Sequence, residues 1–170
     1  EPHTLLGMHS LADRPGFAIP AWDPTARNIQ VVRADTPQTY DMARLDSQGF
    51  FELHLPDVDS PFSYTFHSIY SSGERSWKDP YCLAPSVTNE ALIPFNEGWD
   101  RRPFSKLGAI PRIHEDVEGV SFVIWAPSAR SVHLVGDFNH WNPQSLPMRS
   151  LGSSGCRELF VPFAKIGDKY

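Results

Sequence analysis

The chain contains one stretch twice: GFAIPAWDPTARNIQVV at residues 16–32 and GVSFVIWAPSARSVHLV at residues 119–135. Each residue of the second copy lies 103 positions after its counterpart, and Gly, Trp, Pro, Ala, Arg and Val recur in both. A second pair of blocks follows in the same order, SQGFFELHLP at 47–56 and SSGCRELFVP at 153–162. Blocks that recur in one order at nearly constant spacing indicate a duplicated structural unit. The sequence therefore predicts two copies of one domain.

Both copies have the spacing and composition of short β-strands. Apolar and polar residues alternate in Phe51-Glu-Leu-His-Leu, as they do in half-buried strands. The 16 prolines and 11 glycines are spread along the whole chain, where they interrupt long helices. Only residues 88–96 have helical character, and Pro94 limits them to about a turn or two. These features predict an all-β fold of two tandem immunoglobulin-like β-sandwiches.

The repeat also predicts the domain boundaries. We expect a first β-sandwich at residues 1–87, a linker at 88–106 and a second β-sandwich at 107–170. After Pro56 the first copy continues through a further strand and a turn, whereas the second copy has eight residues after Pro162. We therefore expect the second sandwich to be incomplete before its last strands, and the chain to be a fragment of a longer protein.

Composition and charge exclude several classes of function. The 170 residues include 15 Lys and Arg against 20 Asp and Glu, a net charge of −5, which argues against a nucleic-acid partner. There is no run of 18 apolar residues to cross a membrane and no signal peptide, so we expect a cytoplasmic protein without a membrane partner. A (β/α)₈ barrel, which takes roughly 250 residues, does not fit.

No motif for catalysis or for a cofactor occurs. The sequence has no nucleophile elbow, no P-loop, no Rossmann glycine pattern and no HExxH helix. The seven histidines and two cysteines never take the spacing of metal ligands. We predict no catalytic residue, no metal site and no cofactor in this chain.

The five tryptophans fall into different contexts. Trp22 and Trp125 occupy equivalent places at the ends of apolar strands, and we expect both to fill the cores. Trp141 lies instead in the polar, turn-rich segment GDFNHWNP at 136–143. An exposed indole there, flanked by Asn139 and Asn142, suits a sugar-binding surface, because the flat ring covers the C–H face of a pyranose while amides bond its hydroxyls.

Two other interpretations of the tryptophans stay open. Trp141 could fold back over the edge of the sandwich. Trp77, which follows the turn at Gly73, is a second candidate for sugar binding, with core packing as its alternative.

The segments WAPSAR at 125–130 and GDFNHW at 136–141 resemble carbohydrate-binding module family 48, also called the isoamylase N-terminal domain. With PHTLLGMH at 2–9 and KDPY at 78–81, the whole chain resembles the amino-terminal region of bacterial 1,4-α-glucan branching enzymes. The long form of these enzymes carries two such sandwiches in tandem.

The resemblance implies an α-glucan partner, glycogen or a maltooligosaccharide. It also implies a separate catalytic barrel with a retaining carboxylate pair, so that this chain alone is inactive. In the second copy Trp141 matches the family's stacking tryptophan. In the first copy Trp77 matches the family's second tryptophan, but Thr65 stands where the family has a lysine, so each copy carries half of the usual site. Two alternatives remain: a non-enzymatic glucan- or protein-binding module, and the N-terminal region of a related debranching hydrolase.

Overall fold

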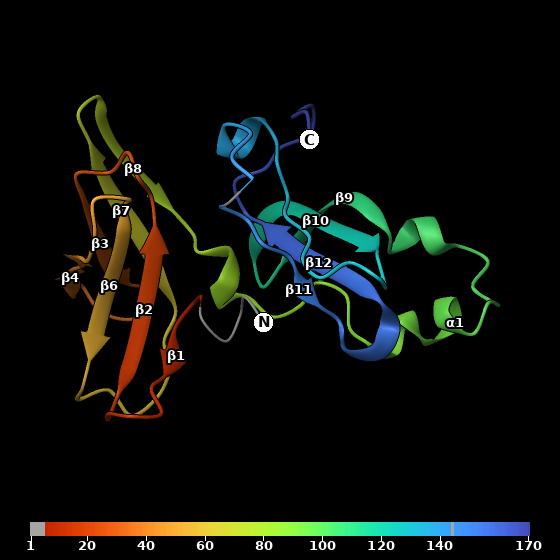
Figure 1. Ribbon diagram of the computed structural model, residues 1–170, viewed down its shortest axis with the longest axis horizontal. Helices are drawn as coiled ribbons and strands as arrows, with labels where there is room; N and C mark the ends of the chain where they lie inside the picture. Colours follow the sequence, from red (N-terminus) through yellow and green to blue (C-terminus); the bar gives the residue numbers. More distant parts are fainter. Residues whose placement is uncertain (1–5, 144) are drawn as a thin grey trace. The chain divides into compact units, whose positions relative to one another are not determined.

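The computed structural model describes residues 6–143 and 145–170, which form two compact units (Figure 1). The first unit ends at Cys82 and the second begins at Leu83.

The first unit consists of two four-stranded antiparallel sheets. One sheet has the order β1-β2-β6-β5, with β1 (His9–Ser10), β2 (Phe17–Trp22), β6 (Phe50–Leu55) and β5 (Ala43–Arg44). The other has the order β4-β3-β7-β8, with β4 (Thr39–Asp41), β3 (Asn28–Arg33), β7 (Tyr64–Tyr70) and β8 (Gly73–Trp77). Ile19 and Phe51 from the first sheet pack with Val31 and Phe66 from the second in one buried core. The alternation of side chains along each strand places these residues on the inner faces.

The second unit contains, among its described residues, one four-stranded antiparallel sheet with the order β11-β12-β10-β9. Its strands are β9 (Gly108–His114), β10 (Val117–Trp125), β11 (Arg149–Ser150) and β12 (Cys156–Val161). The segments around His133 and Pro147 pair more loosely, through a single bridge between these two residues. The unit also holds the four-residue helix α1 (Ile93–Asn96). Short 3₁₀ turns in the two units span Pro80–Cys82, Glu90–Leu92, Pro103–Ser105, Asp137–Asn139 and Gly152–Ser154.

The backbone reproduces the repeat predicted from the sequence. β2 pairs with β6 from Phe17–Leu55 to Trp22–Phe50, and β10 pairs with β12 over the equivalent six positions. Three backbone hydrogen bonds outside the ladders also recur at equivalent positions. The bonds from Asp23 N–H to Gly49 O, from Met42 N–H to Ile29 O and from Leu45 N–H to Phe50 O occur in the first unit. Their counterparts in the second unit run from Ala126 N–H to Gly155 O, from Met148 N–H to Val132 O and from Leu151 N–H to Cys156 O. The all-β prediction is confirmed, and the aligned sequence blocks share one strand register.

The outer face of the second sheet is covered by residues 83–107, which we call the strap. Val87 and Leu92 of the strap pack against Val123 of β10 and Cys156 of β12. Covering this face explains why four successive residues of β10 and the last four of β12 are all buried. The structure divides the chain five residues before the expected boundary at 87. Within the expected linker 88–106, Ala91, Leu92 and Phe95 pack against the second sheet.

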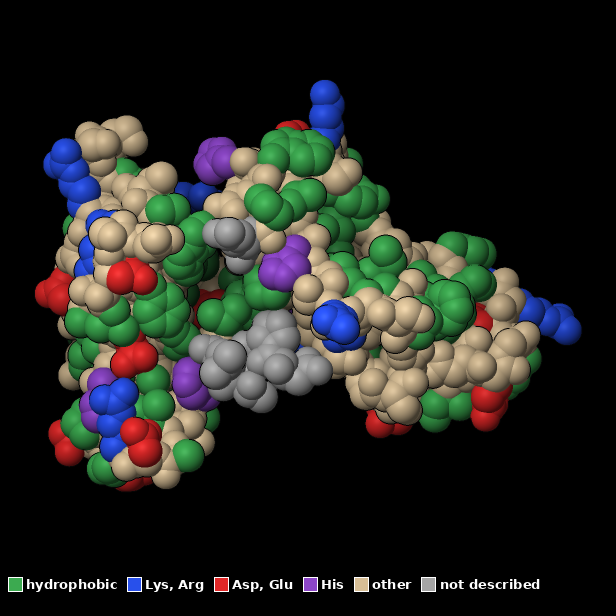
Figure 2. All heavy atoms as spheres, in the orientation of Figure 1, with side chains coloured by type: hydrophobic (Ala, Val, Ile, Leu, Met, Phe, Trp, Pro, Cys, Tyr) green, Lys and Arg blue, Asp and Glu red, His purple; other side chains and the backbone are tan. Residues whose placement is uncertain are grey.

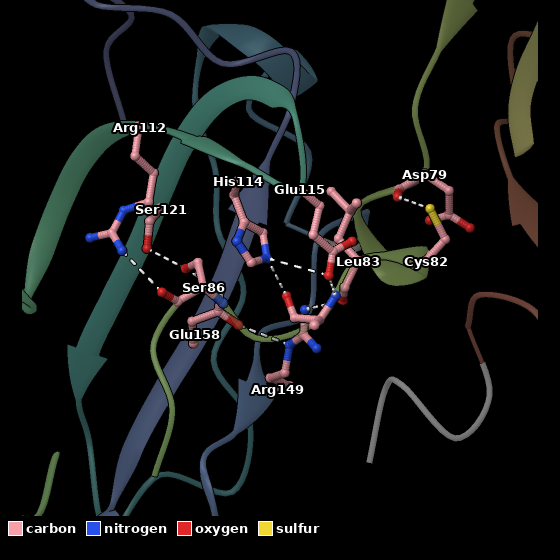
Figure 3. A network of polar contacts seen from close by, with 11 residues as sticks. Asp79, Cys82, Leu83, Ser86, Arg112, His114, Glu115, Ser121, Arg149 and Glu158 are labelled. Atoms are coloured by element: carbon pink, nitrogen blue, oxygen red, sulfur yellow. Dashed lines mark hydrogen bonds and ion pairs between the residues drawn. The ribbon is translucent and has the colours of Figure 1, made fainter. Parts of the chain in front are cut away.

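Polar groups fix the first part of the strap on the sheet (Figure 3). Glu158 is fully buried, and its Oε1 accepts hydrogen bonds from the backbone N–H and the hydroxyl of Ser86, at 3.0 and 2.6 Å. Because the single hydroxyl proton of Ser86 goes to Glu158, Ser121 donates its own proton to Ser86 Oγ, 2.5 Å away. Arg149 places Nε 2.8 Å from Glu158 Oε2 and donates from Nη2 to Leu83 O.

The prediction for Trp125 is wrong. Its side chain is 56% exposed, and Trp22 is only half-buried. Trp125 closes β10 on the face that the strap covers, and there it meets the edge of Phe95, with 6.2 Å between the ring centroids. On this face of β10, Val123 is the last side chain in the buried core. Trp125, two residues further on, therefore lies at the edge of the contact between strap and sheet.

No helix among the described residues has the length and apolar composition needed to cross a membrane. On the face drawn in Figure 2, Lys and Arg side chains are scattered singly and no continuous basic patch is visible.

Candidate functional site

The polar loop Gly136–Asn142 of the second unit holds the tryptophan singled out by its context. A 3₁₀ turn at Asp137–Asn139 starts the loop, and the backbone N–H groups of Asn139 and Trp141 both donate to Gly136 O, at 3.1 and 3.0 Å. His140 and Trp141 then take the left-handed conformation, with φ of 54° and 58°. Two successive non-glycine residues in this region are strained, so the surrounding contacts must hold them there.

The Asn139 side chain supplies much of that support. Its Oδ1 accepts from Gly136 N–H at 2.9 Å, and its Nδ2 lies 3.0 Å from Leu134 O, Asn142 O and Ser145 Oγ. These contacts engage the oxygen and both amide protons of Asn139 with partners in the loop and in the residues that flank it. Asn139, predicted as a sugar contact, is thus placed where it braces the loop.

Trp141 presents its ring at the surface. The side chain is 50% exposed, and its Nε1–H donates to Asp137 Oδ1 at 3.0 Å. One edge of the indole is therefore fixed by a carboxylate while part of its apolar surface faces solvent. Asn142 follows directly, and its backbone N–H donates to Asn139 O at 3.1 Å.

Asp137 connects this loop to the end of the chain. Its Oδ2 accepts from Lys169 N–H at 3.0 Å, and its own N–H donates to Lys169 O at 2.9 Å. The pKa of the Asp137 carboxyl lies below its usual range because the Lys169 N–H, and after it the Trp141 indole N–H, bond the carboxylate. Sequence reasoning missed this residue, although its position four residues before Trp141 is part of the same motif.

Three aromatic rings anchor the two segments on the sheet. Phe122 of β10 lies 5.6 Å from Phe138 of the loop and 5.2 Å from Tyr170, measured between ring centroids. Gly136 makes this packing possible, because a Cβ there would lie 2.6 Å from Lys169 O and 2.7 Å from the Phe138 ring. The close approach, rather than the backbone conformation, requires glycine.

Trp77, the other candidate, lies in the first unit and not in a loop. It ends β8, its ring centroid is 4.6 Å from that of Phe66, and its Nε1–H donates to Ser68 Oγ at 2.9 Å. The ring is half-buried against the core of that unit. Of the four predicted site residues, the structure brings Asn139, Trp141 and Asn142 together in one loop.

No group of three or more His, Cys, Asp or Glu side chains suited to a metal ion occurs among the described residues. The candidate site is an aromatic surface on a braced polar loop, which can stack on a flat ligand face.

Comparison with known proteins matches each unit to a family. Residues 1–81 match the alpha-1,4-glucan branching enzyme GlgB N-terminal domain, and residues 106–170 match carbohydrate-binding module 48, the isoamylase N-terminal domain. The chain therefore belongs to the class of tandem immunoglobulin-like β-sandwich regions that contain a carbohydrate-binding module 48.

Relatives define the class more closely. The chain is 38% identical to 1,4-alpha-glucan branching enzyme GlgB 2 of Streptomyces coelicolor over all of its length, and 36% identical to the GlgB of Thermosynechococcus vestitus, again over all of its length. In both cases it spans 22% of the relative. It corresponds to the N-terminal region of the GlgB branching enzymes. Its first unit matches the model of their N-terminal domain, and its second unit matches carbohydrate-binding module 48.

Among solved structures, a pullulanase from Paenibacillus barengoltzii, crystallised as a D350A mutant with maltotriose, aligns with 63% of this chain and 17% of its own. The identity is 19% and the TM-score 0.40.

Proposed function

We propose that the second unit binds α-glucan through the loop Gly136–Asn142, as part of a 1,4-α-glucan branching enzyme. The observation that carries the proposal is the half-exposed Trp141 indole, held at one edge by Asp137 in a loop whose other side chains, apart from Phe138, are polar. A pyranose stacks its C–H face on such a ring, while its hydroxyls need donors and acceptors at the rim.

The chemistry of branching would lie outside this chain. In the proposed whole protein, a catalytic barrel cleaves an α-1,4 linkage and transfers the freed chain to a 6-hydroxyl through a retaining carboxylate pair. The chain described here would be inactive alone and would hold glycogen or a maltooligosaccharide near that barrel. The same proposal places the protein in the cytoplasm.

A single stacking tryptophan binds weakly. Covering about 80 Å² of apolar surface at ~25 cal/mol per Å² contributes about 2 kcal/mol. A millimolar Kd corresponds to a net binding free energy of about 4 kcal/mol. The contacts must reach this value after the loss of translational and rotational freedom has been offset, so one stacked ring is not sufficient. We therefore propose that Asn142 adds a rim contact and that a long glucan gains affinity from several weak contacts. Trp77, the second candidate for glucan binding, belongs to the other unit, where its ring packs against Phe66.

Native electrophoresis in gels with and without glycogen tests the proposal. We expect glycogen to retard the chain and Trp141→Ala to abolish the retardation. Trp99→Ala is the matched control, because Trp99 is another exposed tryptophan of the second unit that donates to Glu97 and is remote in sequence from the loop. Equal loss in both variants, or none in Trp141→Ala, would contradict the proposed site. A chain that glycogen never retards would favour a scaffolding or protein-binding role.

A further inference from the structure

The Trp141 ring depends on one neighbouring side chain for its orientation. Asp137 uses its two carboxylate oxygens separately: Oδ1 receives the indole N–H of Trp141 and Oδ2 receives the backbone N–H of Lys169. The three residues thus form a continuous chain of hydrogen bonds from the end of the described chain to the indole.

The first unit shows which part of this arrangement belongs to the fold itself. Ala34 and Ser63 occupy the repeat positions of Asp137 and Lys169, and Ala34 N–H donates to Ser63 O at 2.9 Å, as Asp137 N–H does to Lys169 O. The backbone contact therefore forms without a carboxylate. Residues 34–40 contain no Asn-x-Trp motif. The carboxylate is present in the copy that has the tryptophan and missing from the copy that lacks it.

From this we infer that Asp137 is a positioning residue for glucan, which acts through Trp141 by fixing the plane of its indole. This inference rests on the proposed function of the loop. Trp141 has a strained backbone and a half-exposed ring, so its side chain would sample other rotamers without a partner at Nε1. A ring already held in place loses less conformational freedom when a sugar stacks on it, and affinity rises accordingly.

The depressed pKa of Asp137 supports the same role. Its hydrogen-bond donors keep the carboxyl ionised, and an ionised acceptor bonds the indole N–H more strongly than a neutral one.

A double-mutant cycle in the 170-residue chain tests the inference. Dissociation constants for glycogen would be measured by affinity electrophoresis for the wild type, Asp137→Ala, Trp141→Phe and the double variant. Phenylalanine keeps a stacking ring but has no N–H to donate. When Trp141 is present, we expect Asp137→Ala to weaken glycogen binding roughly three- to tenfold, the range for one lost hydrogen bond. In a chain that already carries Trp141→Phe, we expect Asp137→Ala to have no further effect.

Two further variants control for structure. Asp137→Asn keeps the side-chain size and one acceptor oxygen, and we expect a smaller loss than with alanine. Asp168→Asn is the matched control, since Asp168 also accepts a backbone N–H in the C-terminal segment, from Lys165, without contacting Trp141. It should leave affinity unchanged. Thermal melting by circular dichroism would check that each variant is folded. If Asp137→Ala is unfolded, Asp137→Asn takes its place in the double-mutant cycle.

The indole N–H signals in a ¹H–¹⁵N spectrum provide a second measurement. The signal missing from Trp141→Phe identifies Trp141, and it should shift in Asp137→Ala while the other four indole signals stay in place.

The inference is overturned if Asp137→Ala binds glycogen like the wild type, or weakens it equally in the wild type and in Trp141→Phe. The second result would assign Asp137 a purely structural role through Lys169. If Trp141→Ala itself binds glycogen normally, the proposed function of the loop fails as well, so the two failures are distinguishable.

Discussion

Glu158 and Glu52 occupy the same position of the repeat, and only one of them is buried. Glu52 in β6 is 26% exposed in its side chain and lies 3.4 Å from Arg14 Nη2. Glu158 in β12 is completely buried, 2.8 Å from Arg149 Nε, beneath the strap. The backbone around the two glutamates pairs in one register, and Glu158 differs in the Arg149 opposite it and in the Ser86 of the strap that donates to it.

The Glu158–Arg149 pair should be sensitive to loss of either partner. Arg149→Met leaves the Glu158 charge buried without its cation, which typically costs about 3–5 kcal/mol. Removing Arg14 from the exposed pair with Glu52 should cost at most about 1 kcal/mol. Urea unfolding of Arg149→Met and of Arg14→Met measures both. Similar losses in the two variants would show that the strap does not exclude water from Glu158.

The Ser86 hydroxyl should hold the strap on the sheet. In Ser86→Ala, Glu158 loses its contact at 2.6 Å, and Ser121 loses the oxygen to which it donates. We expect a loss of about 1–3 kcal/mol in stability and faster hydrogen exchange in the strap. Ser105→Ala is the control, because Ser105 donates only to Arg102 O in an exposed turn. Exchange that rises equally in both variants would contradict an anchoring role for Ser86.

The stability of the first unit should fall as pH rises from about 4 to 6. Asp79 is buried; its Oδ2 accepts from the Tyr64 hydroxyl at 2.5 Å, and its backbone oxygen accepts from Cys82 Sγ (Figure 3). Burial raises the pKa of the Asp79 carboxyl to about 6, while the Tyr64 hydrogen bond lowers it in part. Between the unfolded and folded pKa values the folded state binds more proton, so the free energy of unfolding decreases with pH.

The expected decrease is about 3 kcal/mol, complete near pH 7. Urea unfolding at several pH values measures it, and Asp79→Asn should remove the slope. Tyr64→Phe should extend the slope to higher pH, because it deletes a hydrogen bond that favours the carboxylate. A stability that rises across this range would mean that Asp79 is stabilised as a charge.

Gly136→Ala should destabilise the second unit by about 1–3 kcal/mol, because the new Cβ collides with Lys169 O and the Phe138 ring. Gly98→Ala is the control, since a Cβ there meets nothing within 4 Å and only its positive φ is strained. We expect Gly136→Ala also to weaken glycogen binding, by displacing Asp137. Thermal melting and affinity electrophoresis give the two readings. A variant with normal melting and normal binding would show that the loop and the C-terminal segment separate easily.

The sequence was sufficient for the parts of the fold that local patterns encode. The offsets between the repeated blocks predicted equivalent strands, and the pairing of β2 with β6 and of β10 with β12 follows them residue by residue. The strap could not be predicted in this way. Its residues have no strand period, and what covers the sheet is fixed by long-range contacts such as Ser86 with Glu158, 72 positions apart.

The candidate site was only partly predictable for a similar reason. A polar context correctly indicated an exposed Trp141, but the same context cannot separate an asparagine that meets ligand from one that braces the loop. Asn139 has its oxygen and both amide protons engaged, an arrangement that depends on the left-handed turn at His140 and Trp141. The burial of Trp125 was predicted wrongly. Its equivalence to Trp22 gives its position along the strand, but it does not give which residues pack against the side chain.

The recurrence of one backbone register in both units makes the molecule its own reference system. Positions 52 and 158 differ in what covers them, while their neighbouring strands and hydrogen-bond register are the same within a single polypeptide. Identical substitutions at such paired positions, followed in one sample, would isolate the effect of burying a side chain from the effect of the architecture that carries it. Separating these two effects normally requires a comparison of different proteins. Here the duplication provides equivalent positions with the same backbone pairing in one chain.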